Sequence, residues 1–81
     1  MIYKITDARY VREYTIHLKF SDGLEGDVNL KNELDGDIFI PLRDLNKFRK
    51  FKLHPELHTL VWENDADFAP EFLHGIVQIP A

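Results

Sequence analysis

The stretch that most constrains the fold is YTIHLKF, residues 14–20, in which apolar and polar side chains alternate. This period of two is typical of a β-strand with one buried face. Asp22 and Gly23 follow directly, and this pair tolerates the positive φ angles of a type I′ hairpin turn. The alternation then resumes over residues 24–30. Together these residues predict an antiparallel hairpin.

Other segments also favour extended structure. Residues 1–11 mix β-branched, aromatic and polar residues, and we expect them to pair with the strand at 14–20 across Arg12 and Glu13. The stretches KFKLH and HTLVW lie on either side of Pro55. Because the residue before a proline is disfavoured in the helical region, these two stretches predict a second hairpin instead of a helix.

Two further prolines mark the starts of short helices. Pro41 precedes apolar residues at three-residue spacing, which predicts a helix over residues 42–48. Proline at a first helical position sacrifices no intrahelical hydrogen bond, because that N–H has no partner in any helix. Pro70 opens PEFLHGIV, where we expect a second helix that Gly75 can stop.

The whole pattern predicts one α+β domain over residues 1–81, with a small antiparallel sheet of about five strands covered by two short helices. Trp62 ends a strand and is expected in the core. Gly26 falls on the apolar face of its strand, which predicts a bulge or a large neighbour, such as Tyr14 or Trp62, in the space of the missing side chain. Open sheet edges are compatible with a homodimer.

Composition excludes several classes of function. The 81 residues contain no cysteine, which removes disulfides, thiolate metal sites and cysteine nucleophiles. The net charge of −4 opposes general attraction to nucleic acid and to anionic lipid. No apolar run approaches the roughly 20 residues of a membrane span, and the N-terminus lacks the pattern of a secretion signal. We therefore expect a cytoplasmic protein that binds no membrane and no cofactor, and direct nucleic-acid binding is disfavoured.

The stretch WENDADFAPEFLHG concentrates acidic residues and admits two interpretations. Asp65, Asp67, Glu71 and His74 are the ligand and acid/base types that a small metal-dependent or acid/base enzyme would use. The stretch lacks the central glycine and the length of a calcium-binding loop. The alternative is structural: Asn64 and Asp65 form a turn, and the following acids lie near a helix start, where negative charge is favoured. We favour the turn.

A second cluster is basic. Five cations occur with one acid, Asp44, in the segment RDLNKFRKFK. A solvated face is the common explanation for such a run, yet this is the clearest local positive charge on an acidic chain, and we therefore expect it to bind another protein. The candidate partner-binding residues are Arg43, Lys47, Arg49, Lys50 and Lys52.

The histidines give weak signals by comparison. His54 and His58 have the four-residue spacing of a helical zinc site, but Pro55 between them opposes that helix. We interpret both as surface residues that flank a turn. His17 lies on the polar face of its strand without a sequence-visible partner for nucleophilic catalysis, and Ser21 precedes a turn, so a serine-type hydrolase is not expected.

Taken in order, YTIHLKFSDG, DVNL, PLRDLNKFRKFKL, TLVWEND and ADFAPEFLH resemble a bacterial family, the domain of unknown function 2442 (DUF2442), over nearly the whole chain. Each piece is weak alone, but the combination is specific. The chain departs from the family's usual Pro-Asn-Gly turn by having Glu63-Asn64-Asp65 after the tryptophan. The matching positions are Phe20, Asp22, Gly23, Asp27, Leu30, Leu42, Phe48, Trp62, Asp67, Pro70, Glu71 and Leu73.

The resemblance implies a small α+β fold like the N-terminal domain of bacterial proteins that sometimes carry a helix-turn-helix domain behind it. No catalytic residues are established for that family, so the resemblance supplies none. The chain ends at Ala81, and we therefore expect no inherited DNA-binding domain. Single-domain members resemble small partner proteins, which suggests a non-enzymatic interaction or regulatory module, including toxin–antitoxin-type pairs.

Overall fold

The computed structural model describes residues 3–78. It contains a three-stranded and a two-stranded antiparallel sheet, two short α-helices and two 3-10 helices. In chain order the elements are β1 (Ile5–Arg12), β2 (Thr15–Phe20), β3 (Glu25–Asn29), η1 (Lys31–Glu33), η2 (Ile40–Arg43), α1 (Leu45–Phe48), β4 (Lys52–Leu53), β5 (Leu60–Val61) and α2 (Pro70–Ile76).

The strands form in the segments where alternation predicted them. The sheet order is β1-β2-β3, and Ile16 of β2 lies opposite Val28 of β3 and Tyr10 of β1. The turn between β1 and β2 places Glu13 at a φ of 44°. The Phe20 N–H bonds the carbonyl of Leu24, so the turn after β2 spans residues 21–23 and is longer than the expected two-residue turn. Only the glycine of the Asp-Gly pair has a positive φ there.

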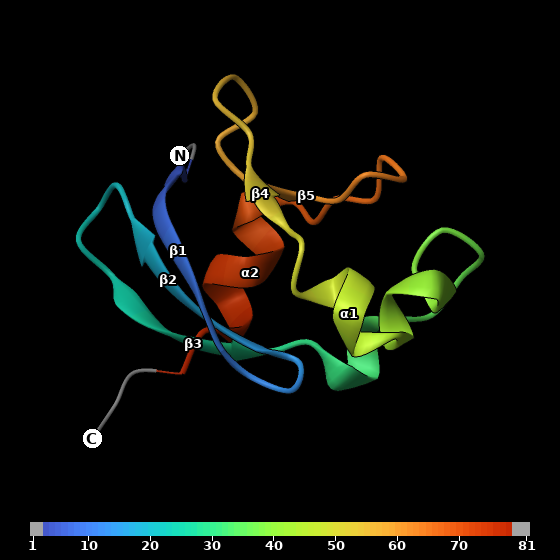
Figure 1. The fold of residues 1–81 in the computed structure, drawn as a ribbon. Helices are drawn as coiled ribbons and strands as arrows, with labels where there is room; N and C mark the ends of the chain where they lie inside the picture. Colours follow the sequence, from blue (N-terminus) through green and yellow to red (C-terminus); the bar gives the residue numbers. More distant parts are fainter. Residues whose placement is uncertain (1–2, 79–81) are drawn as a thin grey trace.

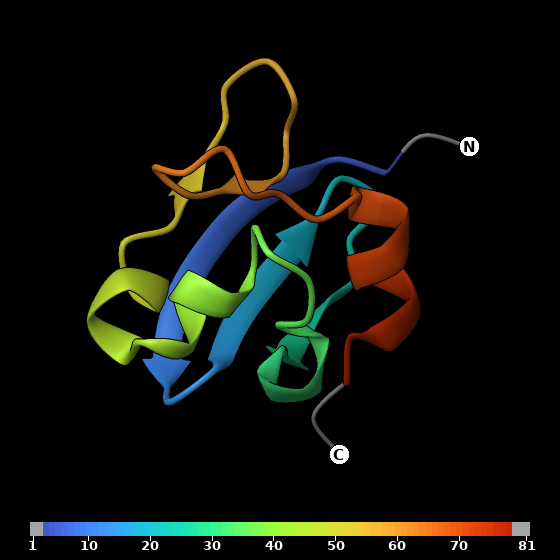
Figure 2. The ribbon, with the colours of Figure 1, turned by 90° about the vertical axis from the view of Figure 1, so that its right-hand side faces the viewer.

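The expected sheet of about five strands is instead two sheets. β4 and β5 pair with each other through two residues each, and their hairpin joins β1 by a bond from the Ile5 N–H to the His58 carbonyl. The long connection over residues 30–51 folds into η1, η2 and α1, which separate the two hairpins along the chain. Figures 1 and 2 show these helices, α2 and the β4–β5 pair on one side of the three-stranded sheet.

The helix expected over residues 42–48 is divided into η2 and α1. Asp44 between them has an extended backbone with ψ of 114°, and its carboxylate accepts a hydrogen bond from the Asn46 N–H. A short acid that caps a new helix start competes with continuous helix, which explains the break. α2 begins at Pro70 as expected, but it continues through Gly75 to Ile76.

The core lies between the sheet and its covering elements. Ile16, Leu18, Phe48 and Leu73 are fully buried, and Trp62, one residue past the end of β5, is 4% exposed, which confirms its predicted place in the core. Phe48 contacts the tryptophan ring with centroids 5.8 Å apart. The second half of the chain therefore covers the buried face of β2.

Gly26 faces the backbone of residue 78, and neither of the large side chains that we expected fills its space. A Cβ atom on Gly26 would lie 2.3 Å from the carbonyl oxygen of Gln78. The segment is held there because the Asp27 N–H donates to the Gln78 carbonyl at 3.0 Å, and the Gln78 N–H donates back at 2.8 Å. Glycine is thus required by a close backbone approach, not by a bulge.

No helix within residues 3–78 has the length and apolarity to cross a membrane.

Candidate interaction site

The structure separates the five predicted partner-binding cations into three groups: two have contacts within the fold, two line a cleft, and Lys52 does neither. Arg43 belongs to the fold: its Nε donates to the carbonyl of Leu34, and its Nη2 to Asp35, both at 3.0 Å. Its own carbonyl accepts a hydrogen bond from the Tyr14 hydroxyl. The Arg43–Asp35 pair is exposed, so solvent screens its attraction. The two hydrogen bonds of Arg43 nevertheless connect the end of η2 to the loop that precedes it.

Arg49 is also occupied. Its guanidinium lies 5.8 Å from the centroid of the Tyr10 ring, a distance at which a cation is attracted to the aromatic face. Because Tyr10 is in β1, this contact joins the end of α1 to the edge of the three-stranded sheet. Arg49 therefore stabilises the docking of α1.

Lys47 and Lys50 form the second group. Both are exposed, and within the described part of the chain neither forms an ion pair. Both line the same cleft of about 420 Å³, a volume typical of ligand sites. Lys52 in β4 is exposed but does not line this cleft. The other lining residues are Pro41, Leu42, Trp62, Glu63 and Asn64.

The apolar part of the cleft belongs to the hydrophobic core. Leu42 and Trp62 are only 3% and 4% exposed. Trp62 is fixed because its indole Nε1 donates to the carbonyl of Phe48 at 2.8 Å. Phe48 is the last residue of α1, so one hydrogen bond connects the cleft's aromatic residue to the helix that carries Lys47. The cleft is therefore a product of core packing.

The opposite rim is the turn after β5. The Trp62 N–H bonds the Ala66 carbonyl at 2.9 Å, and Asp65 takes a φ of 68°. The amide of Asn64 accepts a bond from the Ala66 N–H and donates one to the carbonyl of Ile38, at 3.2 and 2.7 Å. The predicted turn is confirmed. The aspartate adopts the left-handed conformation in place of a glycine.

The residues of the alternative enzymatic site are spread over the turn after β5, the bridge from Asp67 to Val61, and α2. Asp65 lies in the turn, whereas Glu71 lies in the first turn of α2. The His74 Nε2 is 2.9 Å from the carboxylate of Asp22, and its ring stacks on Tyr3 with centroids 3.7 Å apart. No three histidine, aspartate or glutamate side chains among residues 3–78 are grouped to hold a metal ion.

The stretch HPELH is a turn, as expected. The Nδ1 atom of His54 accepts hydrogen bonds from the N–H groups of Glu56 and Leu57, at 3.1 and 3.0 Å. His58 has a φ of 55°. The two histidines therefore shape the β4–β5 hairpin and do not lie on one helical face.

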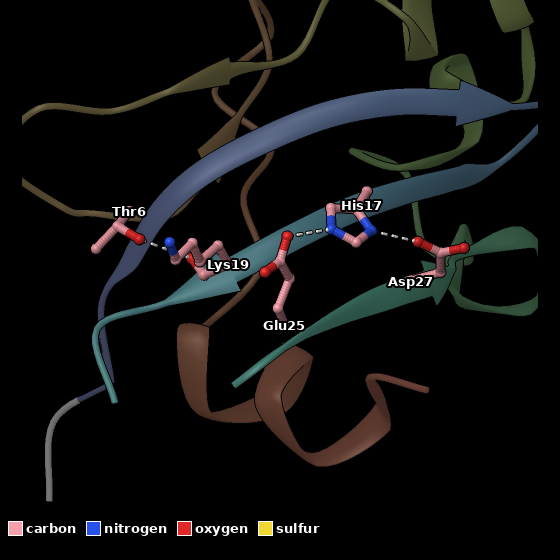
Figure 3. Close-up of polar contacts among 5 residues, drawn as sticks. All are labelled: Thr6, His17, Lys19, Glu25 and Asp27. Carbon is pink, nitrogen blue, oxygen red and sulfur yellow. Dashed lines mark hydrogen bonds and ion pairs between the residues drawn. The ribbon is translucent and has the colours of Figure 1, made fainter. Parts of the chain in front are cut away.

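One arrangement was missed at the sequence level. On the outer face of the three-stranded sheet, His17 lies between Glu25 and Asp27, with 2.7 Å from each ring nitrogen to a carboxylate oxygen (Figure 3). The hydrogen bond to Glu25, and then that to Asp27, raises the pKa of His17 above its usual value. The bond from His17 lowers the pKa of Glu25.

The strand register contained the signal for this cluster. A tight connection after β2 places His17 opposite Asp27 and Lys19 opposite Glu25, so both acids share the face of the histidine. A protonated imidazole donates from both nitrogens, and here both have carboxylate acceptors. Neither nitrogen is then left to accept a proton or a metal, so the cluster has the character of a cross-strand ion pair.

Comparison with known proteins gives a family without an assigned activity. The model of the family described as "Protein of unknown function (DUF2442)" matches residues 5–76. No curated protein and no solved structure matches the chain. The expected likeness to the N-terminal domain of helix-turn-helix proteins is therefore not confirmed.

Proposed function

The chain belongs to the DUF2442 family, and on that premise we propose that it is a non-enzymatic protein-interaction module whose cleft between α1 and the turn after β5 binds an acidic region of another protein. Within this proposal the role is regulatory, as in toxin–antitoxin-type pairs, and the binding takes place in the bacterial cytoplasm. The regulatory part depends on the family resemblance alone.

The observation that supports the proposal is the state of Lys47 and Lys50. Arg43 and Arg49 of the same basic run have contacts within the fold, whereas Lys47 and Lys50 are exposed, form no ion pair with residues 3–78, and border an apolar cleft. An apolar centre with a charged rim is the usual anatomy of an interaction site, and the charge selects and orients the partner.

The proposal revises the predicted basic surface. Arg43 and Arg49 have contacts within the fold, so their replacement would disturb packing as well as charge. Lys47 and Lys50 can be changed without removing a described ion pair. A test of binding should therefore use these two lysines.

The test is selection from a random peptide library displayed on phage, with the immobilised whole chain as target. We expect the enriched peptides to carry net negative charge, and to lose binding to the Lys47→Glu/Lys50→Glu variant. Circular dichroism and thermal unfolding should show that this variant keeps the fold.

The matched control is Lys4→Glu/Lys31→Glu, which changes the net charge equally at two exposed lysines that do not line the cleft. The selected peptides should bind this control as they bind the unmodified chain. Enrichment of peptides without acidic bias, equal loss in both variants, or no enrichment at all would contradict the proposal.

A further inference from the structure

The cleft also restricts what its occupant can be. Building on the proposed function, we infer that the cleft takes an extended acidic peptide segment with one large apolar side chain, which enters against Trp62 and Leu42 while neighbouring carboxylates pair with Lys47 and Lys50.

The apolar anchor follows from the hydrogen bonds that the lining has already made. The only polar side-chain atom of Trp62 donates to the Phe48 carbonyl. The amide of Asn64 is used at both ends, by the Ile38 carbonyl and by the Ala66 N–H. A polar group placed against Trp62 or Leu42 would lose water without gaining a side-chain partner, which is unfavourable. An apolar side chain loses nothing there.

The charge of the rim selects the residues that flank this anchor. Lys47 lies in α1 and Lys50 lies two residues past its end, where the Lys50 N–H bonds the Lys47 carbonyl at 3.1 Å, so the two lysines share one turn of the chain beside the cleft. Glu63 on the opposite rim is the only acid in the lining, so two positive groups and one negative group leave a net charge of +1. The rim therefore attracts carboxylates on its α1 side, and Glu63 reduces that attraction.

The surroundings favour a segment that extends beyond the cleft. Ile38 and Ile40 are 44% and 47% exposed, which is high for residues of their type. The carbonyl of Ile38 accepts the bond from Asn64, and Ile40 directly precedes Pro41, so both adjoin lining residues. A bound segment that continues over η2 can cover apolar surface outside the cleft.

The chain contains a built-in probe. Trp62 is its single tryptophan and lines the cleft, so its fluorescence and its indole N–H signal in NMR report occupancy without a label. The ligands are three synthetic peptides of equal length without tryptophan: one with leucine between glutamates, one with serine between glutamates, and one with leucine between lysines.

We expect the leucine–glutamate peptide to shift the Trp62 signals and to bind most tightly. Replacement of its leucine by serine should weaken binding roughly tenfold or more, because burial of a leucine side chain is worth about 1.5–3 kcal/mol. The leucine–lysine peptide should not bind. Equal binding of the serine peptide would overturn the apolar anchor but leave the acidic partner of the proposed function intact.

Variants of the rim should move affinity in opposite directions. Lys47→Gln/Lys50→Gln should weaken binding of the leucine–glutamate peptide roughly threefold to tenfold, and Glu63→Gln should strengthen it a few-fold, as exposed ion pairs allow. Lys4→Gln/Lys31→Gln is the matched control. Binding that ignores the rim variants, a failure of all three peptides, or equally tight binding of a short single-stranded DNA would overturn the assignment.

Discussion

The outer face of the three-stranded sheet and the cleft beside α1 both display charged residues, but they use them differently. On the sheet, β-pairing places His17 between Glu25 and Asp27, so the charges satisfy one another. At the cleft, Lys47 and Lys50 lie over apolar core residues without such partners in the described structure. A count of charges does not reveal a binding surface, whereas the partners of those charges distinguish the two regions.

The largest effect on stability is expected at Trp62, because the apolar residues that line the cleft also belong to the hydrophobic core. Trp62→Ala should lower the free energy of unfolding by about 3–5 kcal/mol, the usual cost of deleting a buried aromatic side chain. Urea denaturation followed by circular dichroism measures this loss. The variant Trp62→Phe, which keeps a ring but leaves the Phe48 carbonyl without its donor, should lose less. A near-neutral alanine variant would show that the cleft is separate from the core.

The sheet region has its own sensitive position. Gly26→Ala should cost about 1–3 kcal/mol of unfolding free energy, because the new Cβ would overlap the Gln78 carbonyl and force the backbone to move. Gly75→Ala is the control, since nothing lies within 4 Å of a Cβ there. Thermal unfolding of both variants provides the measurement. If Gly26→Ala were as stable as Gly75→Ala, the close approach of the Gln78 carbonyl to Gly26 would be contradicted.

The histidine cluster should make stability depend on pH. The folded pKa of His17 is raised above 6.5, so its contribution is fully present below pH 6.5 and is lost as the pH rises through the folded pKa. The pKa of Glu25 is lowered, so its contribution is present above pH 4.5 and is lost as the pH falls through its folded pKa.

The advantage of the unmodified chain over His17→Gln should therefore be largest between these two transitions and should shrink at higher pH. Denaturant midpoints measured across the pH range test this expectation, and His17→Gln/Glu25→Gln is the matched double variant. A stability difference that does not change with pH would show that the ionisation of His17 and Glu25 does not contribute to stability, as is common for exposed ion pairs.

The smallest change in stability is expected where the effect on binding is greatest. Lys47→Gln/Lys50→Gln should change the free energy of unfolding by less than about 0.5 kcal/mol, because both lysines are exposed and no described ion pair is removed. Urea denaturation beside the unmodified chain provides the check. A large loss would mean that the lysines stabilise the fold, which would remove the contrast between the two regions.

Local patterns predicted the elements but not their arrangement. Alternation located β2 and β3, and Pro70 located α2, because these signals depend on neighbouring residues. The separation into two sheets depends on how the connection over residues 30–51 packs, which no local pattern encodes. For the same reason the close approach of Gln78 to Gly26 was not foreseen.

The candidate site was predicted in part. The basic run was visible in the sequence, but only the spatial contacts distinguish Arg43 and Arg49, which contact other parts of the fold, from Lys47 and Lys50, which form no ion pair with residues 3–78. The cleft joins α1 to residues 62–64, far along the chain, so its apolar floor had no sequence signal. The acidic stretch was correctly interpreted as a turn because Asn64 and Asp65 act through their own backbone.

The two reciprocal hydrogen bonds between Asp27 and Gln78 limit how copies of the chain can assemble. They occupy the middle of the outer edge of β3, so a strand from another chain cannot pair with β3 without displacing them. Growth of a fibril by strand addition requires two unpaired sheet edges on every chain, because each chain must pair with one neighbour on each side. With the edge of β3 occupied, strand addition to this sheet would be confined to the part of β1 that is not bonded to the β4–β5 hairpin, and it would stop at two chains.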